Sequence, residues 1–169
     1  MSTIIPDPVI ASEKLPQSVD VVVIGGGIIG VSTALFLAER GVSVALCEKG
    51  LIGAEQSGRN WGWVRQMGRD PGEIPLAMES VELWRGLNQR LDLETGYRQT
   101  GILYVCTTDR EVAEHQAWLE RARGFGLPSR LLSRDEVLLL APTAVPGIRA
   151  GLYTATDGRG EPTKAAAAI

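Results

Sequence analysis

The stretch that decides the fold is Val19 to Glu48, VDVVVIGGGIIGVSTALFLAERGVSVALCE. Its first apolar run, Val21 to Ile24, is too short for a helix and is bounded by glycine, which predicts a strand buried on both faces. Gly25, Gly27 and Gly30 follow at the G-x-G-x-x-G positions, and an acidic residue closes the segment. Strand, glycine turn, helix, strand and acid together indicate a Rossmann-like βαβ unit that binds a dinucleotide.

The three glycines have separate physical tasks in this motif. Gly25 permits a tight turn after the strand, Gly27 lets the backbone approach a pyrophosphate, and Gly30 lets the helix pack closely on the sheet. A single such motif is weak evidence, but here the flanking strands and helix are all present.

The helix after the turn is expected to run from Ile28 to about Arg40, with its N-terminus directed at the phosphates. Free N–H groups and the helix dipole favour negative charge there, so Ile28 and Ile29 join the predicted site. The second strand ends at Glu48, whose carboxylate can accept hydrogen bonds from an adenosine ribose. Lys49 follows directly and is included among the cofactor-binding residues.

A transmembrane helix is the alternative for this segment, because Val21 to Ala38 contains no charged residue and is just long enough to span a bilayer. Three consecutive glycines, each costing about 1 kcal/mol in a helix interior, oppose it. The segment also lacks a basic flank. No membrane span is therefore expected.

Composition excludes several other classes of protein. The 169 residues are 44% hydrophobic and 22% charged, and the net charge of −3 argues against a nucleic-acid partner. Two cysteines and one histidine form no metal-binding pattern, so no metal is expected. Cys47, at the end of a predicted buried strand, is expected to be a reduced core thiol. Pro6 and Pro8 stand where a signal peptide would be apolar, which favours a cytoplasmic protein.

A long irregular stretch, Lys49 to Gly72, follows the βαβ unit. Loops longer than about 15 residues inside compact domains are usually functional or disordered. This one interleaves tryptophans and arginines: Trp61, Trp63, Arg59, Arg65 and Arg69. Such a composition suits an anionic, planar ligand.

The remainder of the chain predicts alternating helices and strands. One helix begins at Pro75 and runs to about Leu93, with a core face formed by Leu83, Trp84, Leu87 and Leu91. Capping boxes at Thr108-x-x-Glu111 and Ser133-x-x-Glu136 begin two more helices, and Pro162 begins a last one. Strands are expected at Tyr97 to Thr100, Ile102 to Cys106, Arg130 to Leu132 and Ile148 to Tyr153.

The helix that begins after Thr108 is expected to end at Gly124. Its predicted apolar face comprises Val112, Trp118, Leu119 and Ala122. His115 then lies at the flank, where a structural or solvated role is expected rather than a catalytic one.

With these residues in view, the chain resembles the N-terminal part of the FAD-dependent amino-acid oxidoreductases, the D-amino-acid oxidase family that includes glycine and sarcosine oxidases. The resemblance rests on the glycine motif, Glu48, Asp157-Gly158 and Pro162, together with Ser57, Gly58, Arg59 and Asn60. It implies FAD as cofactor, with its ADP half on the first segment. It also implies that Ser57, Gly58, Arg59 and Asn60 are flavin-site residues.

The resulting fold class is α/β: a Rossmann-like FAD-binding unit that runs into the start of an α+β substrate domain. The implied parts are a loose lead-in (1–18), the first part of the FAD-binding domain (19–75), the start of the substrate domain with helical linkers (76–155), and a return segment (156–169). A mononucleotide-binding half needs βαβαβ, and one clear βαβ is present. The fold is therefore expected to be incomplete, with sheet faces uncovered.

The resemblance also implies a reaction: a small-molecule amine or amino acid passes a hydride to the flavin, giving an imine that water hydrolyses. The cofactor carries this chemistry, while the protein orients the substrate. Family members commonly hold the substrate carboxylate with an arginine, whose planar fork suits it. Arg65 is the local candidate, and a loop arginine contacting phosphate or solvent is the alternative.

Two further functions stay open. An NAD-dependent dehydrogenase is possible because Glu48 suits the NAD ribose as well, although the loop after it speaks against that reading. The other is an inactive, truncated remnant, or a nucleotide-binding module that works with a partner subunit. Both the remnant and the module would explain the missing half of the nucleotide fold.

Overall fold

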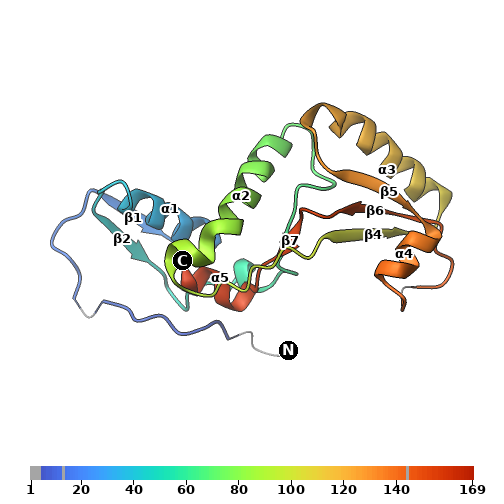
Figure 1. Cartoon of the computed structure of the whole chain (residues 1–169). Helices are drawn as coiled ribbons and strands as arrows, with labels where there is room; N and C mark the ends of the chain where they lie inside the picture. Colours follow the sequence, from blue (N-terminus) through green and yellow to red (C-terminus); the bar gives the residue numbers. More distant parts are fainter. Residues whose placement is uncertain (1–4, 13, 144) are drawn as a thin grey trace. The chain divides into compact units, whose positions relative to one another are not determined.

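A computed structural model describes residues 5–12, 14–143 and 145–169 of the chain (Figure 1). These residues form two compact units. Unit 1 comprises the chain up to Gly62 together with Gly86–Tyr97 and Gly160–Ile169. Unit 2 comprises Trp63–Arg85 and Arg98–Arg159.

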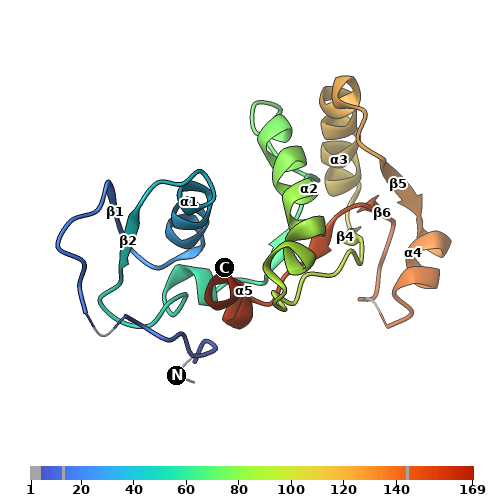
Figure 2. The ribbon, with the colours of Figure 1, turned by 60° about the vertical axis from the view of Figure 1, so that its left-hand side comes forward.

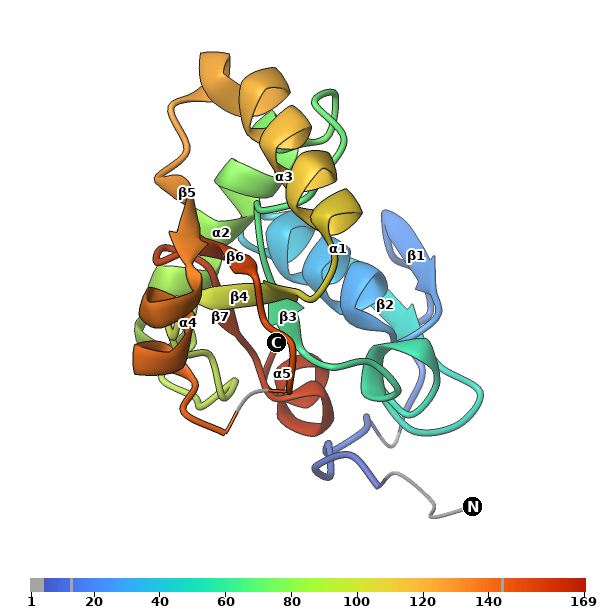
Figure 3. The same ribbon diagram turned by 90° about the vertical axis from the view of Figure 1, so that its right-hand side faces the viewer.

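Unit 1 is built on the predicted βαβ segment. Strands β1 (Val21–Ile24) and β2 (Val44–Cys47) pair in parallel, with Val21 opposite Val44 and Ile24 opposite Cys47. Helix α1 (Ile28–Ala38) connects them and lies along the pair (Figure 3). A short 3-10 helix, η1 (Gln56–Gly58), and helix α5 (Pro162–Ala168) contact each other, and α5 also contacts α1.

The end of helix α2 (Ile74–Leu91) belongs to unit 1 as well. Its Arg90 forms an ion pair with Glu39, just after α1, and lies over the Phe36 ring at 5.1 Å. These contacts fasten the last turns of α2 to α1.

Two predictions about the burial of this segment are wrong. Strand β1 is not buried on both faces, since Val22 is 55% and Ile24 88% exposed. Cys47 is a free thiol but an exposed one, not a core thiol. The reason is that the sheet of unit 1 has two strands and α1 covers one face, so alternate side chains on the other face meet solvent. An uncovered sheet face was expected, and Val22 and Ile24 form one.

The transmembrane alternative is also excluded, because the apolar segment divides into β1, a glycine turn and the 11-residue α1. None of the helices described here has the length and apolarity to cross a membrane.

Unit 2 is built on a three-stranded antiparallel sheet. The central strand is β6 (Ala150–Thr154), flanked by β4 (Ile102–Cys106) and β5 (Ser129–Ser133). Helices α3 (Asp109–Ala122) and α4 (Arg134–Leu140) lie on opposite sides of this sheet (Figure 2). A separate short ribbon pairs β3 (Trp63–Val64) with β7 (Gly158–Arg159).

Each face of the sheet has its own core. The α3 side buries a cluster formed by Met67, Ile74, Ile102, Trp118, Ala122 and Leu152. The α4 side buries Leu132, Val137 and Ile148. Alternation along the strands explains this division, because successive side chains point to opposite faces.

Both capping boxes are confirmed. The Thr108 hydroxyl accepts the Glu111 N–H at 3.2 Å, and the Glu111 carboxylate accepts the Thr108 N–H at 2.9 Å. Ser133 and Glu136 form the same reciprocal pair, at 3.3 and 2.8 Å.

Other boundaries differ from those predicted. The α3 segment does not end at Gly124 but tightens into a 3-10 turn, η2 (Arg123–Phe125), and the left-handed residue is Gly126. The expected strand at Tyr97 to Thr100 is reduced to one bridge at Arg98. On α2, Leu83 is 40% exposed, and the buried positions are Ile74, Val81 and Leu87.

Candidate functional site

The glycine turn of unit 1 has the geometry that a dinucleotide motif requires. Gly25 has a φ of 107°, which L residues rarely adopt. A Cβ on Gly30 would lie 1.9 Å from the carbonyl oxygen of Gly25, so only glycine allows α1 to approach β1 this closely. The Gly25 N–H donates to the Cys47 carbonyl at 2.8 Å, which joins the turn to the end of β2.

Glu48 is fixed against this turn by two backbone hydrogen bonds. Its carboxylate accepts the Gly26 N–H at 2.7 Å and the Gly50 N–H at 2.8 Å. The bond from Gly26 and then the bond from Gly50 lower the pKa of Glu48. The carboxylate is therefore ionised near neutral pH. Each oxygen can accept further bonds, as a ribose would require. Gly26 was not among the predicted site residues, although it is the middle glycine of the triplet.

Ser57 closes the N-terminus of α1 from a distant part of the chain. Its hydroxyl oxygen accepts the Ile28 N–H at 2.8 Å, while the N-cap residue Gly27 offers no side-chain cap. A Cβ on Gly27 would lie 3.1 Å from the same oxygen. The hydroxyl proton of Ser57 remains available to an anion at this helix end, where the dipole also favours negative charge.

Two further loop residues cover the glycine turn, and the sequence reasoning missed both. A Cβ added to Gly26 would lie 2.3 Å from Cδ1 of the Ile52 side chain, so this side chain packs directly on the turn. Gly53 donates its N–H to the Gly26 carbonyl at 2.8 Å and has a φ of 74°. The glycine content of the loop was a signal for such a turn, but not for where it folds.

The other predicted residues of unit 1 occupy different surroundings. Asn60 is engaged within its own loop, donating to the Ser57 carbonyl at 2.8 Å and accepting the Gly62 N–H at 2.6 Å. Arg59 pairs with Glu55 at 3.0 Å. Gly58 is buried, whereas Lys49 is exposed and Ile29 is 79% exposed. Their contacts with a cofactor stay predictions.

Arg65 lies in unit 2 and is half-buried. Its guanidinium donates to the Met67 carbonyl and stands 5.7 Å from the centroid of the Tyr104 ring. Across residues 5–12, 14–143 and 145–169, no carboxylate forms an ion pair with it. The Asp157 carboxylate interacts with Arg65 electrostatically without an ion-pair contact. The N–H donors of Arg65 that Met67 does not use can bind an external anion.

Asp157 holds the backbone next to Arg65. The fully buried carboxylate accepts the N–H groups of Gln66 at 2.9 Å and Met67 at 3.1 Å. Burial raises the pKa of Asp157, while the bonds from Gln66 and Met67 act in the opposite direction. The Asp157-Gly158 motif thus binds a segment 90 positions earlier in the chain.

Comparisons with known proteins agree with this geometry. A family model described as FAD dependent oxidoreductase (DAO) matches residues 20–169. Mitochondrial sarcosine dehydrogenase of Mus musculus is 30% identical over 158 residues, covering 89% of this chain and 17% of that protein. Sarcosine oxidase subunit beta of Rhizobium meliloti is 34% identical over 128 residues, 73% of this chain and 30% of the subunit.

Among solved structures, L-amino acid deaminase from Proteus myxofaciens in complex with anthranilate superposes with a TM-score of 0.84 at 29% identity. The match covers 97% of this chain and 37% of the deaminase. The chain therefore spans well under half the length of these relatives. Because the glycine turn, Glu48 and Ser57 fit a dinucleotide and the match extends over residues 20–169, the chain belongs to the DAO family of FAD-dependent oxidoreductases.

Proposed function

We propose that the whole protein oxidises the amine of an amino acid or a secondary amine, with FAD as hydride acceptor. The carrying observation is the turn of unit 1, where Glu48 binds Gly26 and Gly50 and Ser57 binds the first turn of α1. FAD, when bound, supplies the electron-accepting ring. The printed names of the relatives support an amino-acid substrate, since they refer to sarcosine and L-amino acids.

Arg65 is the proposed ligand of the substrate carboxylate. Its planar guanidinium offers parallel N–H donors to two carboxylate oxygens, which a lysine ammonium does not. The hydrogen bond to Met67 and the Tyr104 ring hold it in place. The deaminase relative was solved with anthranilate, which carries a carboxylate next to an amine.

The experiment is a flavin titration of the full chain followed by reduction. FAD binding is measured by quenching of flavin fluorescence, and a panel of amino acids is then added without oxygen. Bleaching of the flavin band by an amino acid supports the proposal, and Arg65→Lys should raise the concentration needed by roughly tenfold or more. A well-folded chain that ignores FAD contradicts it. The same titration with NAD tests the dehydrogenase alternative, which the FAD family assignment disfavours.

A second candidate is a nucleotide-binding component of a multi-subunit enzyme. It is supported by the similarity to sarcosine oxidase subunit beta, which by its name works within an assembly. It is also supported by the exposed apolar side chains of β1, Val22 and Ile24. If the isolated chain binds FAD and turns over an amino acid at a normal rate, this candidate is wrong.

A further inference from the structure

A compact cluster in unit 2 is formed by the side chains of Trp63, Arg65 and Tyr104. The Trp63 and Tyr104 ring centroids are 5.6 Å apart with the planes tilted by 42°, and the Arg65 guanidinium carbon is 5.7 Å from the Tyr104 centroid. The cluster combines Tyr104 of β4 with Trp63 of β3 and with Arg65, which directly follows β3. His115 of α3 stands on another side of Tyr104, with the centroids 5.9 Å apart.

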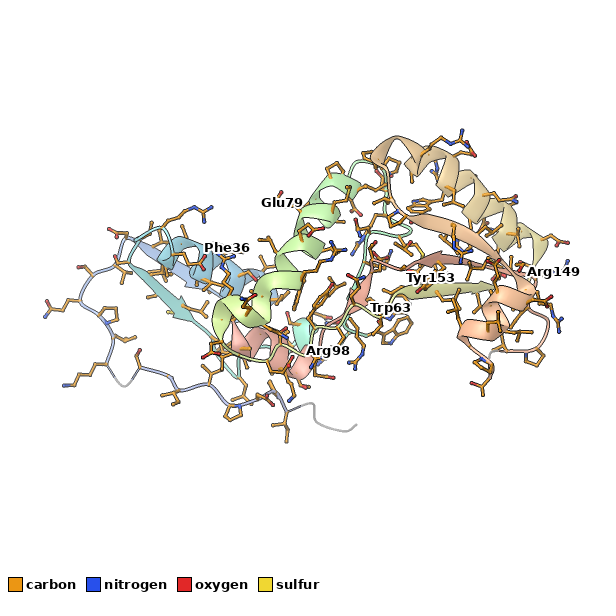
Figure 4. All side chains as sticks on the ribbon, viewed as in Figure 1. Phe36, Trp63, Glu79, Arg98, Arg149 and Tyr153 are labelled. Carbon is orange, nitrogen blue, oxygen red and sulfur yellow. The ribbon has the colours of Figure 1, made fainter. Side chains whose placement is uncertain are left out.

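Trp63 lies in β3 and Arg65 directly follows this strand, and both side chains lie next to the Tyr104 ring. Val64 between them is 8% exposed and belongs to the core, whereas Trp63 remains 43% exposed. Figure 4 shows Trp63 at the edge of unit 2. Core packing thus accounts for Val64 but leaves a large part of the indole surface uncovered.

The polar groups of the cluster have spare hydrogen-bonding capacity. Arg65 donates to the Met67 carbonyl, which leaves most of its five N–H donors available. Within the described part of the chain, the Tyr104 hydroxyl has no hydrogen-bond partner. Burial raises the pKa of Tyr104, so its hydroxyl keeps its proton and can donate.

From this arrangement we propose that Trp63, Arg65 and Tyr104 bind an amino acid whose side chain is a flat aromatic ring. Its carboxylate binds Arg65 and the Tyr104 hydroxyl, and its ring packs on Trp63. This assignment rests on the proposed function, since it names the substrate class of the same oxidation. Contact between two aromatic rings raises affinity roughly 2- to 13-fold over the effect of the apolar area that they bury. A ring on the ligand is therefore favoured over an aliphatic side chain.

Three non-oxidisable probes test the proposal on the full chain with FAD added. 3-Phenylpropionate has both ring and carboxylate, propionate has the carboxylate alone, and 3-phenylpropionamide has the ring without the charge. Calorimetric titration is expected to give a Kd for 3-phenylpropionate at least about tenfold lower than for either other probe. Equal affinity for propionate and 3-phenylpropionate overturns the aromatic assignment.

Variants test which residue binds the ring of the ligand and which residues bind its carboxylate. Trp63→Leu should weaken 3-phenylpropionate by about tenfold and leave propionate unchanged, whereas Arg65→Lys should weaken both. Tyr104→Phe should also weaken both acids. Tyr153→Phe, on the opposite face of the same sheet, is the matched control and should change neither. If Trp63→Leu retains the preference for the ring, the proposed site is wrong.

The probes report binding without turnover, which separates this inference from the proposed function. FAD binding without any preference for 3-phenylpropionate contradicts the inference alone. A preference for 3-phenylpropionate in a chain that neither binds FAD nor oxidises amino acids contradicts the proposed function instead.

Discussion

Glu48 is held by the backbone on both sides, through the N–H groups of Gly26 and Gly50. Glu48→Ala removes a charged acceptor, worth about 1.5–3 kcal/mol. We expect the Kd for FAD to rise roughly 10- to 150-fold, measured by flavin fluorescence quenching. Glu48→Gln keeps an oxygen acceptor and should give a smaller change. A Kd that Glu48→Ala leaves unaltered would exclude Glu48 from ribose binding.

Asp157 has a comparable role in unit 2, where its buried carboxylate satisfies the N–H groups of Gln66 and Met67. Asp157→Ala leaves both donors unsatisfied, and each buried unsatisfied group costs about 1–3 kcal/mol. Urea unfolding of Asp157→Ala should therefore show a free energy of unfolding that is lower by at least that amount. Asp157→Asn retains one oxygen and should lose less. Equal stability of Asp157→Ala and the parent chain would contradict this role.

Sequence separation explains which site residues could be predicted. The glycines and Glu48 act within one local motif, so their spacing alone indicated their geometry. The Ser57 contact with Ile28 joins residues 29 apart, and that of Asp157 with Gln66 joins residues 91 apart. Such pairings depend on how loops return to the sheet, which hydrophobic periodicity does not report.

The junction of β1 and α1 depends on Gly30, whereas α2 contains a glycine with no such task. A Cβ on Gly30 would meet the Gly25 carbonyl oxygen at 1.9 Å, but one on Gly86 would meet nothing within 4 Å. Gly30→Ala should destabilise the chain by about 1–3 kcal/mol through overpacking and weaken FAD binding. Gly86→Ala should stabilise α2 by about 0.5–1 kcal/mol. Chemical denaturation of both variants checks the pair, and equal effects would refute the packing argument.

The capping box of α4 predicts a pH dependence of stability. A hydrogen bond from Arg130, followed by those from Ser133, lowers the pKa of Glu136 from 4.5 to about 2. Because the folded-state pKa is lowered, the stabilisation is present above pH 4.5 and is lost as the pH falls towards 2. Thermal unfolding midpoints of the parent chain and Glu136→Gln should therefore converge towards pH 2. A constant difference across that range would contradict the assignment.

Elements with a chemical start signal were predicted best. Thr108 and Ser133 begin α3 and α4 as expected, because a capping box satisfies its own backbone groups locally. The end of α3 was misplaced because two glycines, Gly124 and Gly126, could each end it. The segment from Tyr97 to Thr100 has strand-like composition, but among the described residues its β-pairing is a single bridge, between Arg98 and Arg159.

The arrangement of strands and helices within each unit depends on contacts that no single segment determines. In unit 2 the strands run in the order β4–β6–β5, which places the last of the three in the centre. In unit 1 the sequence of β1 fits a strand buried on both faces, yet Ile24 is 88% exposed. Apolar composition reports what a strand can bury, and the neighbouring strands and helices determine what it does bury.

The division into two units makes a prediction for FAD binding that hydrogen exchange can test. A ligand at 100 times its Kd stabilises the bound structure by about 2.7 kcal/mol. Amide hydrogens that exchange only when this structure opens should then exchange roughly 100-fold more slowly. Protection should be strongest at Gly25–Ile28 and Gly50–Gly53, where the backbone of unit 1 forms the turn and its cover. It should be weakest in α4, which packs on the side of the unit 2 sheet away from Tyr104. Uniform protection along the chain would show instead that both units open together, because amides that share one opening event gain the same stabilisation.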